Sequence, residues 1–204
     1  DLRSLLITSP GPTEGKSLTT ANLGVAFAQY GKKVIIVDTD MRKPTQHKMF
    51  GLDNTVGLTN LMLGEVSLRD VLKPIDNLAL FVLPTGPLPP NPAELLGSDR
   101  MKEIIDELKD NADIVIFDTP PVVAVTDAAL LASRVDGVIL VLAAGKTKIE
   151  VAQKARELLL NVRANILGTV LNMMEEDNPD YYYNNYYYYG DNHESKRRSR
   201  KKSG

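Results

Sequence analysis

The chain has 204 residues, of which 43% are hydrophobic and 25% are charged, and its formal net charge is −2. This composition excludes a collagenous or wholly disordered protein and indicates one globular domain. Because the chain has no cysteine, it has no disulfide scaffold, thiol nucleophile or cysteine-ligated metal site, and a reducing compartment is favoured. No apolar run approaches the roughly 20 residues that cross a bilayer. We therefore expect a cytoplasmic protein, and no nucleic-acid partner.

Six apolar runs of strand length recur along the chain, at residues 4–8, 33–37, 78–83, 113–117, 137–142 and 166–172. The runs are continuous rather than alternating, which is typical of strands buried on both faces of a parallel sheet. Helical spacing of apolar residues lies between them at residues 16–30, 98–108 and 147–162. Strands that alternate with helices predict an α/β fold with a doubly wound, mainly parallel sheet.

Two segments interrupt this alternation. Residues 84–92 are too rich in proline for a helix or a strand, so we predict an extended loop there. From residue 175 onward the chain has no aliphatic residue, and we expect residues 175–204 to form a disordered tail behind a folded domain at residues 1–174. The chain begins at Asp1, without Met and close to the first apolar run. We therefore expect an upstream portion to precede it.

The first predicted strand runs into the sequence SPGPTEGKS at residues 9–17, and a helix follows. This is the context of a phosphate-binding P-loop, because backbone N–H groups and the helix N-terminus face the anion. The strict pattern has glycine where this chain has Pro10, and a short GKS can also arise as a simple helix start. We predict a nucleotide site in which Lys16 reaches the β- and γ-phosphates and Ser17 binds Mg²⁺. The expected nucleotide contacts in this segment are Gly11, Thr13, Glu14, Gly15, Lys16, Ser17 and Leu18.

Three aspartates follow predicted strands, Asp38 and Asp40 after the second and Asp118 after the fourth. Ligands bind beyond the carboxyl ends of strands in an open parallel sheet, so these acids should share an edge with Lys16. Taken singly, each could be a helix cap or a turn residue. Around a triphosphate they would supply Mg²⁺ ligands and a proton acceptor. We expect Ser17, Asp38 and Asp118 at the metal, and Lys16, Asp38, Asp40 and Asp118 in catalysis.

Two further side chains are expected at the same edge. Asn172 ends the last predicted strand, where its amide matches the hydrogen-bonding edge of adenine, although a capping role is equally compatible with the sequence. Arg42 follows Asp38 and Asp40 in the sequence. It can pair with the predicted acids, bind phosphate or lie on the surface.

The tyrosines are unevenly distributed. Because seven of the eight lie within residues 181–189, the core should consist of aliphatic residues with the other aromatic residues, which are Phe27, Tyr30, Phe50, Phe81 and Phe117. By composition alone, the tyrosine cluster could be an associating low-complexity segment. Beside a nucleotide site, it is better explained as a set of phosphate acceptors. The candidate acceptors are Tyr181, Tyr182, Tyr183, Tyr186, Tyr187, Tyr188 and Tyr189.

Taken together, the motifs resemble those of the bacterial tyrosine kinases of capsular and exopolysaccharide synthesis. The resemblance is carried by the P-loop, by VDTDMR at 37–42, by FDTPP at 117–121, by TGPLPPNPAELL at 85–96 and by the tyrosine cluster. MinD- and ParA-like ATPases share the individual motifs, but the combination of segment 85–96 with the tyrosines is specific. The extra P-loop lysine of those ATPases would fall at Gly11, so a dimerising nucleotide switch is the alternative rather than the preferred interpretation.

The resemblance implies a protein tyrosine kinase that uses ATP and Mg²⁺ and phosphorylates its own tail between subunits of a ring-shaped oligomer. It further implies a transmembrane modulator that recruits the kinase to the inner face of the membrane, other protein tyrosine substrates and a cognate phosphatase. The family's oligomerisation motif would lie upstream of Asp1. In the mechanism we expect, Lys16 holds phosphate, Ser17 and Asp118 organise Mg²⁺, and Asp38 or Asp40 deprotonates the tyrosine hydroxyl.

Overall fold

The structure is a computed structural model, and it describes residues 2–174. The chain divides into two units, Asp1–Asn172 and Met173–Gly204. The predicted tail at residues 175–204, with its tyrosines and its basic run, lies outside the described residues. The described residues therefore belong to the first unit, apart from Met173 and Met174.

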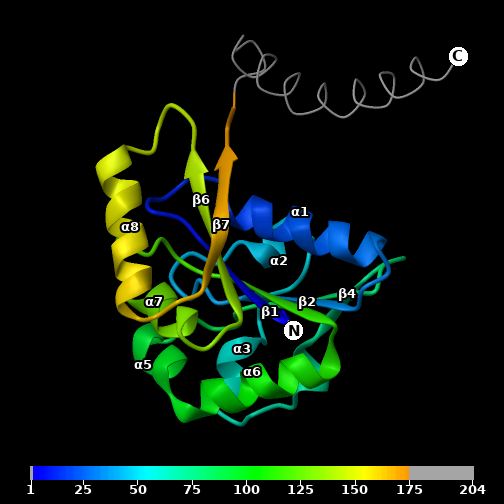
Figure 1. Ribbon diagram of the computed structural model, residues 1–204. Helices are drawn as coiled ribbons and strands as arrows, with labels where there is room; N and C mark the ends of the chain where they lie inside the picture. Colours follow the sequence, from blue (N-terminus) through cyan, green and yellow to red (C-terminus); the bar gives the residue numbers. More distant parts are fainter. Residues whose placement is uncertain (1, 175–204) are drawn as a thin grey trace, which may run out of the picture. The chain divides into compact units, whose positions relative to one another are not determined.

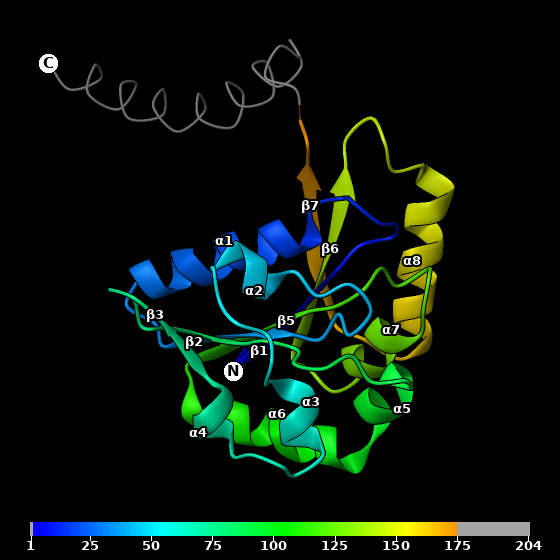
Figure 2. The same ribbon diagram turned by 180° about the vertical axis from the view of Figure 1, so that it is seen from behind.

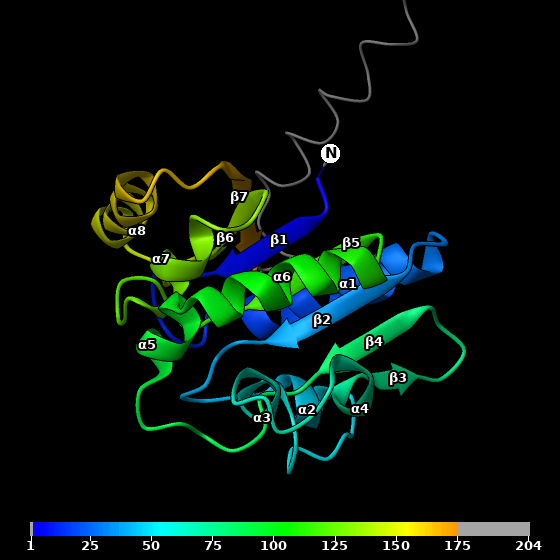
Figure 3. The same cartoon turned by 90° about the horizontal axis from the view of Figure 1, so that it is seen from below.

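The first unit is built on one seven-stranded sheet whose strands lie in the order β3-β4-β2-β5-β1-β6-β7 (Figure 3). All neighbouring strands are parallel except β3 and β4, which are antiparallel. This confirms the predicted α/β fold with a doubly wound, mainly parallel sheet. The strands are β1 (Ser4–Thr8), β2 (Val34–Asp38), β3 (Lys73–Ile75), β4 (Leu80–Leu83), β5 (Ile114–Asp118), β6 (Gly137–Ala143) and β7 (Ile166–Asn172).

Helices connect the strands, and the three predicted from periodicity are confirmed as α1, α6 and α8. Helix α6 begins where expected, because the Ser98 hydroxyl accepts a hydrogen bond from the Met101 N–H and caps the first turn. The five other helices are one or two turns long. The helices are α1 (Lys16–Gln29), α2 (Gln46–Met49), α3 (Leu58–Met62), α4 (Leu68–Val71), α5 (Pro92–Gly97), α6 (Asp99–Asn111), α7 (Asp127–Ala132) and α8 (Ile149–Asn161).

Helices cover both faces of the sheet, so each strand buries alternate residues in opposite directions (Figures 1 and 2). On one face, Ile36 and Ile116 pack in a cluster with Ala28 of α1. On the other face, Phe117 packs in a larger cluster with residues of α3, α6, α7 and α8, among them Ile104. Burial on both faces explains the continuous apolar runs of the inner strands. The expectation was wrong for residues 166–172, because β7 is an edge strand on which Leu167 and Leu171 are exposed. Within residues 2–174, every helix is too short or too polar to span a bilayer.

Four of the five aromatic residues expected in the core are fully buried or pack against it. Tyr30 is the exception, since it directly follows α1 and is 87% exposed. The expectation for Tyr30 was wrong because a helix end carried beyond the sheet leaves its last side chain in solvent.

The proline-rich segment runs as a loop from Pro84 until Pro92 opens α5. Its base lies backbone to backbone against the start of α3, where the Leu58 and Thr59 N–H groups donate to the carbonyls of Pro84 and Thr85 at 2.8 and 2.9 Å. A Cβ on Gly57 would lie 2.2 Å from the Pro84 oxygen, so only glycine permits this approach. The base of the loop is therefore fixed.

Candidate functional site

The loop between β1 and α1 has the geometry of a P-loop. Gly15 is the N-cap of α1 and has φ of +91°, in the left-handed region. A Cβ at this position would also lie 1.8 Å from the Asn172 amide nitrogen, so no side chain fits. Thr13 adopts φ of +56° two residues earlier. Two left-handed residues turn the chain sharply into the helix, as a loop that wraps an anion requires.

The P-loop is held from inside by Glu14. Its buried carboxylate accepts the N–H of Gly11 at 2.7 Å and the hydroxyl of Thr147 from the loop before α8. The Glu14 carbonyl accepts the Asn172 amide at 3.1 Å. Glu14 therefore shapes the loop with its side chain, and Asn172 comes to the P-loop from the end of β7 as the sequence led us to expect.

A lysine that no sequence motif marks holds the P-loop from the segment between β6 and α8. The Lys146 ammonium donates to the carbonyls of Pro12 and Thr13, at 3.2 and 2.9 Å, and to the Thr13 hydroxyl. These bonds engage two carbonyl groups of the loop, and in such a loop it is the peptide N–H groups that bind an anion.

The start of α1 is suited to an anion. Across Lys16–Gln29, all of which the structure describes, no side chain caps the first turn and none in that turn is acidic. The first N–H groups of a helix have no partner within the helix, and the helix dipole adds positive potential at the same end. Ser17 is buried there, while Leu18 is exposed.

Lys16 lies among the three predicted aspartates. Its ammonium is 3.1 Å from Asp40 Oδ2 and 3.6 Å from Asp118 Oδ1, and it donates to Ser17 Oγ at 3.0 Å. Asp38 and Asp118 are direct neighbours in the pairing of β2 with β5. All three carboxylates are buried. Burial lowers the pKa of Lys16, but the charges of Asp118 and Asp40 outweigh it, so the net pKa is raised. The residues that the sequence assigned to chemistry therefore do meet.

Asp38 differs from the other two acids because backbone N–H groups bond both of its oxygens. Oδ1 accepts the N–H of Asp40 at 3.2 Å, and Oδ2 accepts the N–H groups of Thr45 and Gln46 at 2.9 Å each. Burial and then the charge of Asp118 raise the pKa of Asp38 to about 8, against the opposing effect of these backbone donors. Asp38 thus fixes the loop that follows β2.

Asp118 keeps one oxygen without a hydrogen bond. Its Oδ2 accepts the side-chain amide of Gln46 at 2.8 Å. Its Oδ1 is a buried atom that, among the described residues, receives no hydrogen bond, although Lys16 lies nearby. Burial raises the pKa of Asp118, while Lys16 and Gln46 oppose the shift. A buried carboxylate oxygen without a hydrogen-bond donor is a position at which a cation would be stabilised.

The described residues fit a magnesium ion that also binds phosphate. Residues 2–174 contain no group of three or more histidine, cysteine or acidic side chains that could hold a metal ion by themselves. Mg²⁺ is usually bound through one or two carboxylates together with substrate phosphates and water. Asp118 Oδ1 and Ser17 Oγ, side by side at Lys16, provide the protein's share of such a site.

Arg42 pairs with an acid that the sequence analysis did not select. Its Nε and one terminal nitrogen donate to the two oxygens of Asp127, at 2.9 and 3.1 Å. Asp127 is fully buried in the first turn of α7, and its side chain raises the pKa of Arg42. Arg42 therefore lies at the surface, where it pairs with an acid of α7 rather than with the acids at the P-loop.

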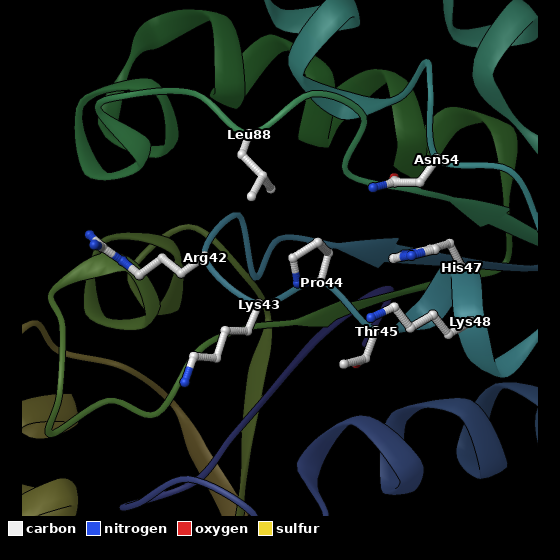
Figure 4. Close-up of a pocket in the computed structure, with 8 residues that line it drawn as sticks. All are labelled: Arg42, Lys43, Pro44, Thr45, His47, Lys48, Asn54 and Leu88. Atoms are coloured by element: carbon white, nitrogen blue, oxygen red, sulfur yellow. The ribbon is translucent and has the colours of Figure 1, made fainter.

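A pocket of about 510 Å³ opens beside this site (Figure 4). The segment after β2 lines one side with Lys43 and Lys48, and the proline-rich loop contributes Leu88. Figure 4 shows the Leu88 side chain pointing from its loop toward Pro44. No sequence pattern indicated this pocket, because its walls come from segments about 40 residues apart that lack regular periodicity.

Comparison with known proteins agrees with the geometry. The family model described as ParA, NUBPL iron-transfer P-loop NTPase, matches residues 3–202. Tyrosine-protein kinase YwqD of Bacillus subtilis (strain 168) is 50% identical over 171 residues, which cover 84% of this chain and 72% of that protein. Tyrosine-protein kinase CpsD of Streptococcus agalactiae is 38% identical over 173 residues, covering 84% of this chain and 76% of that protein. The crystal structure of the chimerical protein CapA2B2 has a TM-score of 0.84 and 43% identity, and the match covers 86% of this chain and 78% of that one.

The fold and the site are those of a ParA-like P-loop NTPase. Within that class, the chain belongs to the bacterial tyrosine-protein kinases. The resemblance to the kinases of capsular and exopolysaccharide synthesis is thereby confirmed, and the kinase interpretation is supported over the nucleotide switch.

Proposed function

We propose that this kinase transfers the γ-phosphoryl group of ATP, with Mg²⁺, to tyrosines that include its own cluster at residues 181–189, and that it thereby regulates polysaccharide synthesis and export. The supporting observation is the meeting of Lys16, Asp40, Asp118 and Ser17 at the start of α1. Phosphoryl transfer needs positioning and charge neutralisation more than covalent chemistry, and these residues provide both.

In this proposal the P-loop amides and the Lys16 ammonium bind the phosphates and neutralise their charge. Ser17 and Asp118 hold Mg²⁺, which when bound would neutralise the developing charge on the phosphate oxygens. Gln46 keeps the Asp118 carboxylate in place through its amide. Asn172 meets the adenine, and Glu14 keeps the loop in shape.

The proton of the tyrosine hydroxyl passes to Asp40. Asp38 and Asp40 were both candidates for this role, but both oxygens of Asp38 accept backbone N–H groups. Asp40 presents Oδ2 at Lys16, while its Oδ1 accepts the N–H groups of Arg42 and Lys43. Asp38 acts through the loop it holds and through its charge.

The finer parts of the family resemblance belong to the same proposal. A transmembrane modulator would recruit this cytoplasmic kinase to the membrane, a ring-shaped oligomer would present one tail to the next active site, and a phosphatase would reverse the reaction. The name of the CapA2B2 chimera, which joins two proteins, is compatible with a modulator partner.

The test is the Lys16→Met variant, which keeps an unbranched side chain one atom shorter than lysine and removes the charge. After incubation with Mg-ATP, we expect intact-mass analysis to show tail phosphate reduced at least about 100-fold, because charge neutralisation is the main source of the rate. Lys32→Met, at an exposed lysine beyond α1, is the matched control. Undiminished tail phosphate in the Lys16 variant would refute the proposal, and ATP loss with unmodified protein would favour the nucleotide switch.

A further inference from the structure

The pocket beside the catalytic acids is attached to them through the backbone. The Arg42 and Lys43 N–H groups donate to Asp40 Oδ1, and the Thr45 N–H donates to Asp38 Oδ2. One wall of the pocket is therefore tied directly to the acid that accepts the proton and to its neighbour. A ligand in the pocket therefore lies next to the site at which phosphoryl transfer is proposed.

The opposite wall is connected to the same strand end. The Thr85 hydroxyl donates to the Asp38 carbonyl at 2.8 Å, which fixes the loop that carries Leu88. The Asn54 amide exchanges hydrogen bonds with Gly86, accepting its N–H at 2.8 Å and donating to its carbonyl at 3.3 Å. Both walls are thus set by Asp38 and its neighbours, so the pocket and the catalytic acids have a fixed relation.

The lining of the pocket is basic and incompletely paired. Arg42, Lys43 and Lys48 contribute three cations, and none of the lining residues is acidic. Among the described residues, Lys43 and Lys48 form no ion pair within 4 Å. Two lysines without a carboxylate partner in that part of the chain favour a ligand with several anionic oxygens.

We propose that this pocket is an acceptor-peptide subsite that binds the acidic segment 175–180 of a second copy of the chain. This inference rests on the proposed kinase function and names the substrate class it prefers: tyrosines preceded by carboxylates. The segment reads EEDNPD and ends immediately before Tyr181. Its four carboxylates complement the lysines of the pocket, and Leu88 and Pro44 offer apolar contact to the peptide between them.

The spacing of the acids suits a pocket next to the reaction. An extended peptide advances about 3.3–3.6 Å per residue, so the acids one to six positions before a tyrosine lie within about 20 Å of it. A peptide that places Tyr181 at Asp40 therefore passes its acidic residues along the adjacent surface. The pocket volume of about 510 Å³ accommodates more than one side chain.

Binding is measured first, without catalysis. The probe is a fluorescent peptide of residues 174–190 with phenylalanine in place of every tyrosine. The receptor is the full chain, in which the acids of its own tail are replaced so that it does not compete. These tail substitutions are Glu175→Gln, Glu176→Gln, Asp177→Asn and Asp180→Asn. We expect the same substitutions in the peptide, or Lys43→Met with Lys48→Met in the receptor, to weaken binding about five- to tenfold.

The losses of affinity caused by the peptide substitutions and by the receptor substitutions should not add, because each set removes the same ion pairs. Lys32→Met with Lys102→Met removes two exposed lysines elsewhere and is the control for net charge. Equal affinity for the acidic and amide peptides would overturn the proposal. An equal loss in the control pair would do the same, because it would show that only the overall charge matters.

Catalysis between copies is measured second. A Lys16→Met chain with a natural tail is the substrate, and a chain with phenylalanine at all seven tail tyrosines is the enzyme. We expect the initial rate of phosphate transfer to fall about five- to tenfold with an amide tail on the substrate or with the Lys43 and Lys48 changes on the enzyme. A rate that responds to neither change would overturn the proposal. If no transfer occurs at all, the kinase function fails, and peptide binding still decides whether the pocket takes acidic peptides.

Discussion

The edge of the sheet where the parallel strands begin and the edge where they end place carboxylates in opposite electrostatic environments. At the edge where the strands begin, Asp136 accepts the N–H groups of Arg3 and Ser4, the Ser4 hydroxyl and the Lys109 ammonium, at 2.8–3.1 Å. Burial tends to raise the pKa of Asp136, but these donors outweigh it and lower the pKa to about 2. The single carboxylate of Asp136 thus accepts four hydrogen bonds.

At the edge where the strands end, three carboxylates are buried together, and the Lys16 ammonium pairs with two of them, Asp40 and Asp118. Burial and then the charge of Asp118 raise the pKa of Asp38, and burial raises the pKa of Asp118 against the opposing charge of Lys16. The first arrangement stabilises the fold. The second holds excess negative charge that a cation can neutralise, which is the electrostatic signature of a functional site.

Among the variants that test this difference between the two groups of carboxylates, we expect the largest effect from Asp118→Asn. The variant keeps an acceptor for Gln46 but removes a charge, so we expect autophosphorylation to fall about 100-fold or more. Its melting temperature should stay the same or rise, because one of the three crowded carboxylates has lost its charge. Asp106→Asn on the exposed face of α6 is the control. A large loss of thermal stability in Asp118→Asn would show that the acids at this edge serve the fold.

The converse result is expected from Asp136→Ala. Removing this carboxylate leaves several donors near the start of β1 unpaired, and we expect the free energy of unfolding to fall by about 2–4 kcal/mol. Denaturation in urea measures this, with Asp110→Ala as an exposed control. The folded variant should still phosphorylate its tail at a rate near that of the parent chain. A selective loss of activity would contradict the division between the two edges.

The smallest effect is a pH dependence of stability. The pKa of Asp136 in the folded protein, about 2, lies below its ordinary value of 3.8. Its contribution is therefore complete above about pH 4 and is lost as the pH falls toward 2. After allowance for its partial exposure, we expect a loss of about 1–2 kcal/mol across this interval. Unfolding curves of Asp136→Asn should lack this part of the pH dependence, and identical curves for both proteins would argue against the assignment.

The strongly periodic parts of the fold were predictable from the sequence, and the short parts were not. Strands such as β5 carry continuous apolar runs because helices bury both their faces, and α1 follows directly from the P-loop pattern. Strand β3 escaped prediction because it has only three residues and includes Pro74, which is tolerated there because β3 is an edge strand. Helices α2 to α4 are too short for a period to show.

The residues of the candidate site also fall into a group that was predictable from the sequence and a group that was not. Lys16 and the three aspartates were found because motifs place them at known ends of strands. Gln46, Asp127, Lys146 and Thr147 were missed because their partners are distant in the sequence, and no local pattern marks a residue whose role arises from folding. Arg42 was noticed, but its partner was not predicted, since nothing near it in the chain points to α7.

The backbone contact between α3 and the base of the proline-rich loop has a consequence for how such kinases diversify. Main-chain atoms and glycine hold the base of this loop, so its position does not depend on the side chains at its tip. Leu88 can change identity without moving Thr85 or Asp38. If the pocket binds the acceptor peptide as proposed, a change at Leu88 alters substrate preference and leaves the catalytic geometry in place.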